Sequence, residues 1–270
     1  MKRLGTNEGT APAALITEKV QPAARRMMLS AVQQNTSSGG EKIVLFAPEG
    51  WGKTTWAAGA EKPIFISTED GLKGVRVDTF PEPRTWQDMF DAVQELRTQD
   101  HAFKSLVIDT IDWAENLCHA ALLDRDKKGS IEDYGYGKGY IIASEEWKKL
   151  LPPLDALRRE KGMNIICLAH AAIRTFNNPT GENWDRYELK TDKRISSLMK
   201  EWSDCVLFGN YDVAIDLKKG QSKGKGYGSE RVLFTSHGAG YDAKNRYALP
   251  DQISANPKDF WSAIKKEAVK

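Results

Sequence analysis

The chain has little of what marks a secreted or membrane-bound protein. No apolar run approaches the roughly 20 residues needed to span a bilayer, and the start, MKRLGTNEGTAPAAL, lacks the continuous apolar segment of a secretory signal. The three cysteines, Cys118, Cys167 and Cys205, are odd in number and spaced neither as a disulfide framework nor as zinc ligands. These absences predict a soluble protein of a reducing cytoplasm.

An excess of one charge sign is also missing. Lysine and arginine total 39 against 37 acidic residues, a formal net charge of +2, which argues against a chain bound to nucleic acid over its whole surface. Charge is concentrated locally instead, because residues 218–228 carry four lysines and no acid. We interpret these lysines as a basic turn that is a candidate for DNA contact: Lys218, Lys219, Lys223 and Lys225.

The 270 residues divide into three predicted parts. Residues 1–40 are polar, end in NTSSGG and indicate a flexible N-terminal tail, within which TEKVQPAARRMMLSAVQQ is compatible with a short helix. Residues 41–250 form the predicted compact core. Residues 251–270 contain the predicted final helix. The core is long enough to bury its apolar surface without disulfide or metal support.

Apolar strand-length runs alternate with helical patterns along the core. The strands are predicted at 42–47, 63–67, 105–110 and 164–169, and the helices at 86–99, 112–124 and 144–160. Strands that are apolar throughout and separated by helices indicate an α/β fold with a mainly parallel central sheet flanked by helices. After a polar, helix-poor stretch at 171–193 and a short helix, residues 204–219 and 230–236 are expected to extend the sheet with antiparallel strands.

The most specific motif is APEGWGKT at 47–54, directly after the first apolar strand. Small residues let backbone N–H groups point at phosphate oxygens, a lysine reaches the β and γ phosphates, and a hydroxyl ligates Mg²⁺. The motif has Ala47 in place of the usual first glycine. It predicts an ATP site made by Pro48, Glu49, Gly50, Trp51, Gly52, Lys53, Thr54 and Thr55.

Three further residues are expected at the same edge of the sheet. Asp109 ends the apolar run LVID and predicts a second magnesium ligand beside Thr54. Glu69 follows the strand at 63–67 and is the candidate general base, with the adjacent Asp70 as the alternative. His170 ends the run NIICLA, where it is either a contact to the γ phosphate or a structural core histidine.

In this order, the motifs resemble the RecA-like core, and most closely the phage-encoded, single-domain RecA-like ATPases of recombination and single-strand annealing. The resemblance spans roughly 41–250 and implies that Glu69 activates water and that His170 occupies the place of a polar sensor. Residues 244–248, KNRYA, resemble the KNRFG element of RecA-like recombination helicases, with Tyr247 and Ala248 in place of Phe and Gly. This implies that Lys244 and Arg246 contact the nucleotide of a neighbouring subunit.

The resemblance also implies two DNA-binding loops. The first is expected at 127–140, where glycines alternate with tyrosines, and the second at 174–194. Cations mixed with aromatic rings suit single strands, because bases stack on aromatic faces without demanding a sequence. The predicted contacts are Lys138, Tyr140, Arg174 and Arg186; inert surface loops are the alternative.

The predicted function is therefore an ATP- and Mg²⁺-dependent RecA-like ATPase that binds single-stranded DNA and promotes annealing or strand pairing in phage-type homologous recombination. The predicted partners are single-stranded DNA, further copies of the chain in a ring or filament, and a single-strand-binding protein; the predicted location is the host cytoplasm. Two alternatives stay open. One is a non-hydrolysing annealing scaffold that uses ATP only for assembly, and the other is a P-loop kinase acting on a small molecule.

Overall fold

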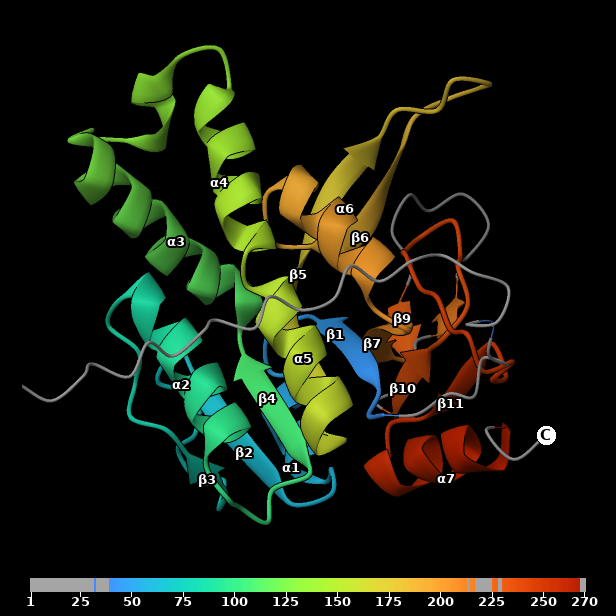
Figure 1. Ribbon diagram of the computed structural model, residues 1–270. Helices are drawn as coiled ribbons and strands as arrows, with labels where there is room; N and C mark the ends of the chain where they lie inside the picture. The colour runs from blue at the N-terminus through green and yellow to red at the C-terminus, as the bar shows by residue number, and fades with distance from the viewer. Residues whose placement is uncertain (1–31, 33–38, 213, 217–224, 228–229, 268–270) are drawn as a thin grey trace, which may run out of the picture. The chain divides into compact units, whose positions relative to one another are not determined.

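The computed structural model describes residue 32 and residues 39–212, 214–216, 225–227 and 230–267 (Figure 1). The predicted tail helix, Lys218, Lys219 and Lys223 lie outside the described residues. Eight strands of the main sheet lie in the order β11-β10-β7-β1-β5-β4-β2-β3, and β6 pairs with β5 beyond this path. The strands are β1 (Lys42–Ala47), β2 (Pro63–Ser67), β3 (Asp78–Thr79), β4 (Ser105–Asp109), β5 (Asn164–Phe176), β6 (Trp184–Leu189), β7 (Cys205–Tyr211), β10 (Arg231–Phe234) and β11 (Gln252–Ser254).

The centre of the sheet is parallel, as the alternation of strands and helices predicts. β1 pairs in parallel with β5 and β7, and β4 pairs in parallel with β2 and β5. The predicted antiparallel extension is present, because β10 pairs antiparallel with β7 and with β11. β7 itself is parallel to β1, so β10 alone reverses direction along this part of the sheet. A separate antiparallel pair joins β8 (Ala214–Asp216) to β9 (Lys225–Tyr227).

Helices cover both faces of the sheet, which is why the central strands are apolar throughout. One face packs Val44 and Phe46 of β1 against five helices, and the other packs Ile43 and Leu45 against two. The first group is α2 (Trp86–Thr98), α3 (Ile111–Asp126), α4 (Lys138–Lys148), α5 (Leu151–Lys161) and α6 (Lys193–Trp202), and the second is α1 (Lys53–Ala58) and α7 (Pro257–Glu267). The result is a three-layer α/β/α arrangement (Figure 1).

Local sequence signals explain where several helices begin and end. The Thr85 hydroxyl accepts a hydrogen bond from the Asp88 amide and the Asp88 carboxylate accepts one from the Thr85 amide, so the predicted capping box starts α2. Gly162 ends α5 in the left-handed conformation, at φ 65°.

The single helix predicted at 144–160 is wrong. The structure has two helices there, α4 and α5, and α4 begins six residues earlier than expected, at Lys138. Pro152 and Pro153 have no amide hydrogen to continue the hydrogen-bond ladder of α4, but they fit the first turn of α5, where amides need no partner within the helix.

The loops expected at 127–140 and 174–194 are also more ordered than predicted. The first contains a short 3-10 helix, Ile131–Tyr134, before α4. The second is largely a β-hairpin, because β5 runs on to Phe176 and pairs with β6. Its polar composition obscured the strands, which cross-strand pairs stabilise: the Phe176 and Trp184 rings lie 4.8 Å apart, and the Thr175 hydroxyl donates to Asp185 at 2.7 Å. In Figure 1 this hairpin rises beyond the carboxyl edge of the sheet.

Candidate active site

The predicted phosphate loop lies between β1 and α1, at the carboxyl edge of the sheet. Gly50 and Gly52 have φ values of 74° and 100°, in the left-handed region that glycine adopts without strain. Gly52 is also the residue before the first turn of α1, so the loop runs directly into the helix that carries Lys53 and Thr54. The backbone conformation is therefore that of a loop whose amides can face an anion.

Lys53 is buried, with 6% of its surface exposed, and its Nζ lies 3.5 Å from the carbonyl oxygen of Ala47. Burial lowers the pKa of Lys53, while the carboxylates of Asp109, Asp112 and Glu69 oppose that shift. An ammonium group in such a place has lost much of its hydration, so an anionic partner such as a phosphate stabilises it strongly.

The two predicted magnesium ligands are in direct contact. The Thr54 hydroxyl donates to Asp109 Oδ2 at 2.7 Å, and Asp109 is buried at the end of β4. Burial raises the pKa of Asp109, and the hydrogen bond from Thr54 opposes the shift. No group of three or more His, Cys, Asp or Glu side chains in the described ranges could hold a metal alone. One hydroxyl and one carboxylate fit Mg²⁺, which usually takes its remaining oxygen ligands from phosphates and water.

Glu69 and His170 face each other across this edge. His170 Nε2 lies 3.9 Å from Glu69 Oε1, while His170 Nδ1 lies 2.8 Å from Asp112 Oδ2. The backbone amide of His170 also donates to Asp112, at 3.0 Å. His170 does not end its strand as expected, since β5 continues past it, but its ring joins the candidate base to a second carboxylate. Asp70, the alternative base, is exposed.

Asp112 is a site residue that the sequence reasoning missed. Burial alone would raise its pKa, but the hydrogen bonds from the ring and amide of His170 outweigh burial and leave the pKa below its usual value. Asp112 is therefore a carboxylate that holds the orientation of His170. The signal was present in the sequence, because an acidic residue three positions after Asp109 falls in the first turn of the following helix.

Trp51 is a second residue whose structural role the motif alone did not reveal. Although it stands between two glycines of the phosphate loop, only 1% of its surface is exposed, and its indole Nε1 donates to the carbonyl of Asn210 at 2.8 Å. Its ring lies over Gly209, where a Cβ atom would come within 2.7 Å of Cε2. The carbonyl of Trp51 accepts a hydrogen bond from Arg231 at 3.1 Å. β7 and β10 thus fix the phosphate loop from its side.

Replacing Gly209 by alanine is expected to displace Trp51 and with it the phosphate loop. The added methyl group overpacks a closed contact, which we expect to cost about 2 kcal/mol of stability. Nucleotide affinity should fall as well. Urea denaturation and ATP titration of Gly209→Ala check both effects. Gly240→Ala is the matched control, because nothing lies within 4 Å of a Cβ at that position; equal behaviour of the two variants would contradict this role for Trp51.

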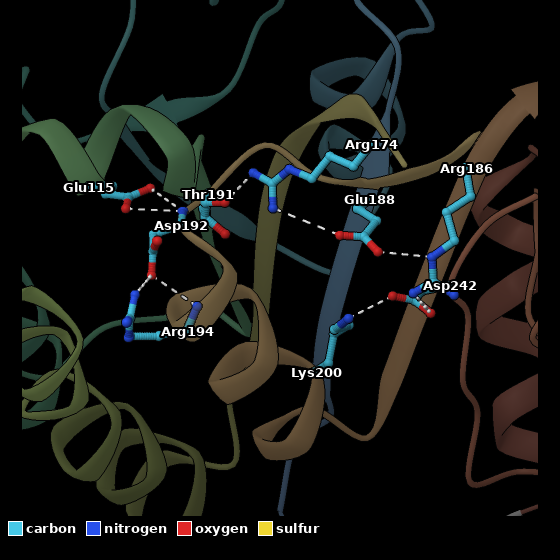
Figure 2. Close-up of polar contacts among 9 residues, drawn as sticks. All are labelled: Glu115, Arg174, Arg186, Glu188, Thr191, Asp192, Arg194, Lys200 and Asp242. Carbon is cyan, nitrogen blue, oxygen red and sulfur yellow. Dashed lines mark hydrogen bonds and ion pairs between the residues drawn. The ribbon is translucent and has the colours of Figure 1, made fainter. Parts of the chain in front are cut away.

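The predicted DNA residues fall into different environments, and Figure 2 shows those of Arg174 and Arg186. Arg186 is buried and its guanidinium lies 2.8 Å from Glu188 and 2.9 Å from Asp242, so the structure places it in an internal ion-pair network. Arg174 donates to the carbonyl of Thr191 at 2.6 Å and keeps 34% of its side chain exposed. Lys138 and Tyr140 lie in the first turn of α4, and Lys225 lies on β9.

Lys244 and Arg246 lie at the amino edge of the sheet. Arg246 pairs with Asp204 at 2.9 Å and keeps 58% of its side chain exposed, while Lys244 Nζ donates to backbone carbonyls at the end of α6. Asp204 lies 42 residues before Arg246, so the sequence around this basic pair did not reveal its acidic partner. The turn after them forms despite the missing glycine, with Ala248 at φ 48°.

A buried glutamate, Glu115, lies one turn after Asp112 on α3. Both of its carboxylate oxygens accept from the amide of Asp192, at 3.1 and 3.0 Å, which ties α3 to the start of α6 (Figure 2). Burial raises the pKa of Glu115 to about 7, with the Asp192 amide opposing the shift. A carboxyl group whose folded pKa lies above its unfolded pKa binds its proton more tightly in the folded state.

Glu115→Gln is therefore expected to change how stability depends on pH. In the wild type, the contribution of protonated Glu115 to the free energy of unfolding is fully present below the ordinary pKa of 4.5. This stabilisation is lost as pH rises through about 7. The wild type should lose about 2 kcal/mol more than Glu115→Gln between pH 5 and pH 8. Urea denaturation at both pH values measures this difference. The exposed-site variant Glu95→Gln should follow the wild type, and parallel curves for all three proteins would contradict the assignment.

Residues 40–247 match the family model described as AAA domain. The match covers more than half of the chain, so the chain belongs to the AAA domain family, a class of P-loop nucleotide-binding proteins. It is 24% identical over 179 residues to the SPbeta prophage-derived uncharacterized protein YorG of Bacillus subtilis (strain 168), an alignment that covers 63% of this chain. The chain spans about half the length of that relative, of which 50% is covered.

Among solved structures, the chain is similar to the RadB recombinase, at 14% sequence identity and a TM-score of 0.43, over 80% of this chain and 86% of that one. The central parallel sheet, the phosphate loop after β1 and the family match together confirm the predicted α/β P-loop core. No helix in the described part of the chain is long and apolar enough to cross a membrane.

Proposed function

We propose that this protein is a Mg²⁺-dependent ATPase that binds single-stranded DNA and promotes annealing or strand pairing in phage-type homologous recombination. The observation that carries the proposal is the meeting of three groups at one sheet edge. These are the buried Lys53, the Thr54–Asp109 contact, and the Glu69–His170–Asp112 chain. Such an edge can hold a nucleoside triphosphate and direct a water molecule at its terminal phosphate.

Each group has a distinct part in hydrolysis. The phosphate-loop amides and Lys53 hold the phosphates, and Thr54 and Asp109 hold Mg²⁺, which offsets the charge of the phosphate oxygens. Glu69 accepts the proton of the attacking water. His170 stands between Glu69 and Asp112, so it is placed to orient Glu69 and to meet the terminal phosphate.

The DNA part of the proposal is supported by the same edge. The α3–α4 segment and the β5–β6 hairpin both rise from it (Figure 1). They contribute Lys138, Tyr140 and Arg174 from opposite sides, and we retain these as DNA contacts, whereas Arg186 is already paired internally. A strand bound between the two segments would lie close to the nucleotide, so the proposal couples DNA binding to turnover.

ATP turnover measured with and without single-stranded DNA tests the function. We expect Mg²⁺-dependent turnover that DNA stimulates. DNA binding without turnover in either condition would favour the scaffold, and transfer of phosphate to a metabolite would favour the kinase. Either result overturns the proposed ATPase.

We further propose that Arg246 acts on a neighbouring copy's nucleotide. Arg246 pairs with Asp204, whose carboxylate accepts from the amide of Lys42 at the first residue of β1. The phosphate loop follows the last residue of β1, about 17 Å away at the strand rise of ~3.3 Å per residue. The exposed Arg246 therefore cannot reach its own nucleotide, so any nucleotide that it contacts belongs to a neighbouring copy.

Mixing two inactive variants tests this arrangement. Subunits with Arg246→Ala keep an intact phosphate loop, and subunits with Lys53→Ala keep an intact Arg246. The mixture is expected to recover part of the turnover that each variant lacks alone, and wild-type turnover per subunit should rise with protein concentration. The control replaces Lys53→Ala by the double variant Lys53→Ala, Arg246→Ala, which supplies no arginine. Recovery equal to the control, or concentration-independent wild-type turnover, would contradict the role in trans.

A further inference from the structure

We infer that the polar cleft between α3, α4 and the segment joining β6 to α6 is a pocket for one base of the single-stranded DNA. The inference rests on the proposed function and names the place where a base is held. The cleft has a volume of about 440 Å³, which is several times that of a nucleobase and allows a base to enter with part of its sugar. The residues of its wall that the inference uses are Trp113, Asn116, His119, Tyr140, Arg174 and Lys190.

An exposed aromatic side chain stands at this cleft. Trp113 keeps 47% of its surface exposed, although it follows a buried strand and a buried first helical residue. It shares one face of α3 with Asn116 and, a turn later, His119, whose ring packs edge-on against Tyr140 with centroids 6.1 Å apart. An indole free of the core gives a base a surface on which to stack, and stacking accepts any base.

The charges of the cleft are arranged for a base inside and a phosphate outside. Its wall includes the carboxylates of Asp112, Glu115 and Asp192, which repel phosphate but accept hydrogen bonds from exocyclic amino groups. Lys190 and Arg174 remain partly exposed, at 52% and 34% of their side chains. These two cations lie where a backbone phosphate would remain when its base enters the cleft.

The wall of the cleft also includes a residue with an unused hydrogen-bonding group. Thr191 is 1% exposed, and its hydroxyl is a buried side-chain group without a hydrogen-bond partner in the described residues. A buried hydroxyl without a partner costs stability, so a polar ligand that reaches it gains binding energy. Lys190, the residue before it, lies 3.8 Å from Glu49 of the phosphate loop. A base that contacts Thr191 therefore lies beside Lys190, the residue that contacts the phosphate loop of the nucleotide site.

The first test separates stacking from charge. Trp113→Ala is expected to weaken binding of a single-stranded oligonucleotide by about 5- to 150-fold, the loss of one stacked base, without changing the dependence of affinity on salt. Trp113→Phe should retain most of the affinity. Lys190→Ala should instead reduce the salt slope by about 0.7. Ile141→Ala is the matched control, because Ile141 is 48% exposed on α4 and does not line the cleft.

The second test removes the base instead of the tryptophan. Wild-type protein should bind an abasic oligonucleotide of equal length less tightly than the intact strand. The affinity should fall by the same factor that Trp113→Ala causes on the intact strand. Trp113→Ala itself should bind the abasic and intact strands with equal affinity. Oligo-dC should bind more tightly than oligo-dU, because cytosine carries an exocyclic amino group that can donate to the carboxylates of the cleft and uracil has an oxygen at that position. An equal loss for Trp113→Ala on intact and abasic strands, or tighter binding of the corresponding RNA, would overturn the inference.

These outcomes are distinguishable from failure of the proposed function. If wild-type protein binds no single-stranded DNA, the function fails and the pocket fails with it. If wild-type protein binds DNA and DNA stimulates turnover, but Trp113→Ala matches Ile141→Ala in every measurement, the pocket alone is refuted and the ATPase stands.

Discussion

Replacing Lys53 by alanine is expected to reduce ATP turnover at least 1,000-fold, to the limit of detection. Lys53 is the one lysine of the phosphate loop, and its ammonium is buried and partly dehydrated before any phosphate arrives. Removing a preorganised charge at a developing anion costs about 4 kcal/mol or more, which corresponds to a loss of about 1,000-fold or more. Steady-state phosphate release in the presence of Mg²⁺ measures the loss.

Thermal unfolding provides a readout that a folding defect would not imitate. Burial of the Lys53 charge disfavours the folded state, so Lys53→Ala should unfold at the wild-type temperature or above it when no nucleotide is present. Excess ATP should raise the unfolding temperature of the wild type but scarcely that of the variant. Lys258→Ala is the matched control, since Lys258 lies on α7 beside a cavity at the amino edge. Full turnover in Lys53→Ala would remove the proposed function.

The sheet and its edge were predictable because buried parallel strands have a strong sequence signature. The strands β1, β2, β4 and β5 each begin within one residue of the start that their apolar run predicts. The residues that end β1, β2 and β4 all lie at the predicted edge of the sheet. Directional structure of this kind follows from local sequence, since parallel strands separated by helices all point the same way.

Contacts between distant residues could not be predicted in the same way. The partner of Arg246 is Asp204, 42 residues earlier, and the ring of Trp51 finds its place only because Gly209 has no side chain. Neither pairing leaves a periodic pattern in the chain. The β5–β6 hairpin was missed for a related reason, because its strands are polar and are stabilised by cross-strand pairs rather than by burial.

Asp112 shows how such a contact changes the interpretation of a motif. The sequence predicted His170 as either a γ-phosphate contact or a structural core histidine, and the structure joins it to Asp112 through both its ring and its amide. A histidine held at Nδ1 has its other nitrogen, Nε2, directed toward Glu69. The candidate base is thus the first member of a chain of three groups, so its replacement is informative only beside the replacement of the other two.

Glu69→Gln is expected to leave ATP bound while slowing hydrolysis about 100- to 1,000-fold, because the amide keeps the shape of the carboxylate and loses its proton acceptor. Asp112→Asn should slow hydrolysis less and should act through His170, since it alters the group that orients the ring. Combining Glu69→Gln with Asp112→Asn should then cost little more than Glu69→Gln alone, because residues that act as a unit are not additive. Single-turnover measurements with saturating ATP separate this loss from a loss of binding.

Asp70→Asn is the decisive comparison, because Asp70 is the neighbouring carboxylate and is exposed, whereas Glu69 lies 3.9 Å from His170. If water is activated at Glu69, Asp70→Asn should retain turnover within a few-fold of the wild type. A larger loss for Asp70→Asn than for Glu69→Gln would show that the base is Asp70. Strictly additive losses for Glu69→Gln and Asp112→Asn would instead show that His170 does not connect them, and that its short contact with Asp112 serves only to pack β5 against α3.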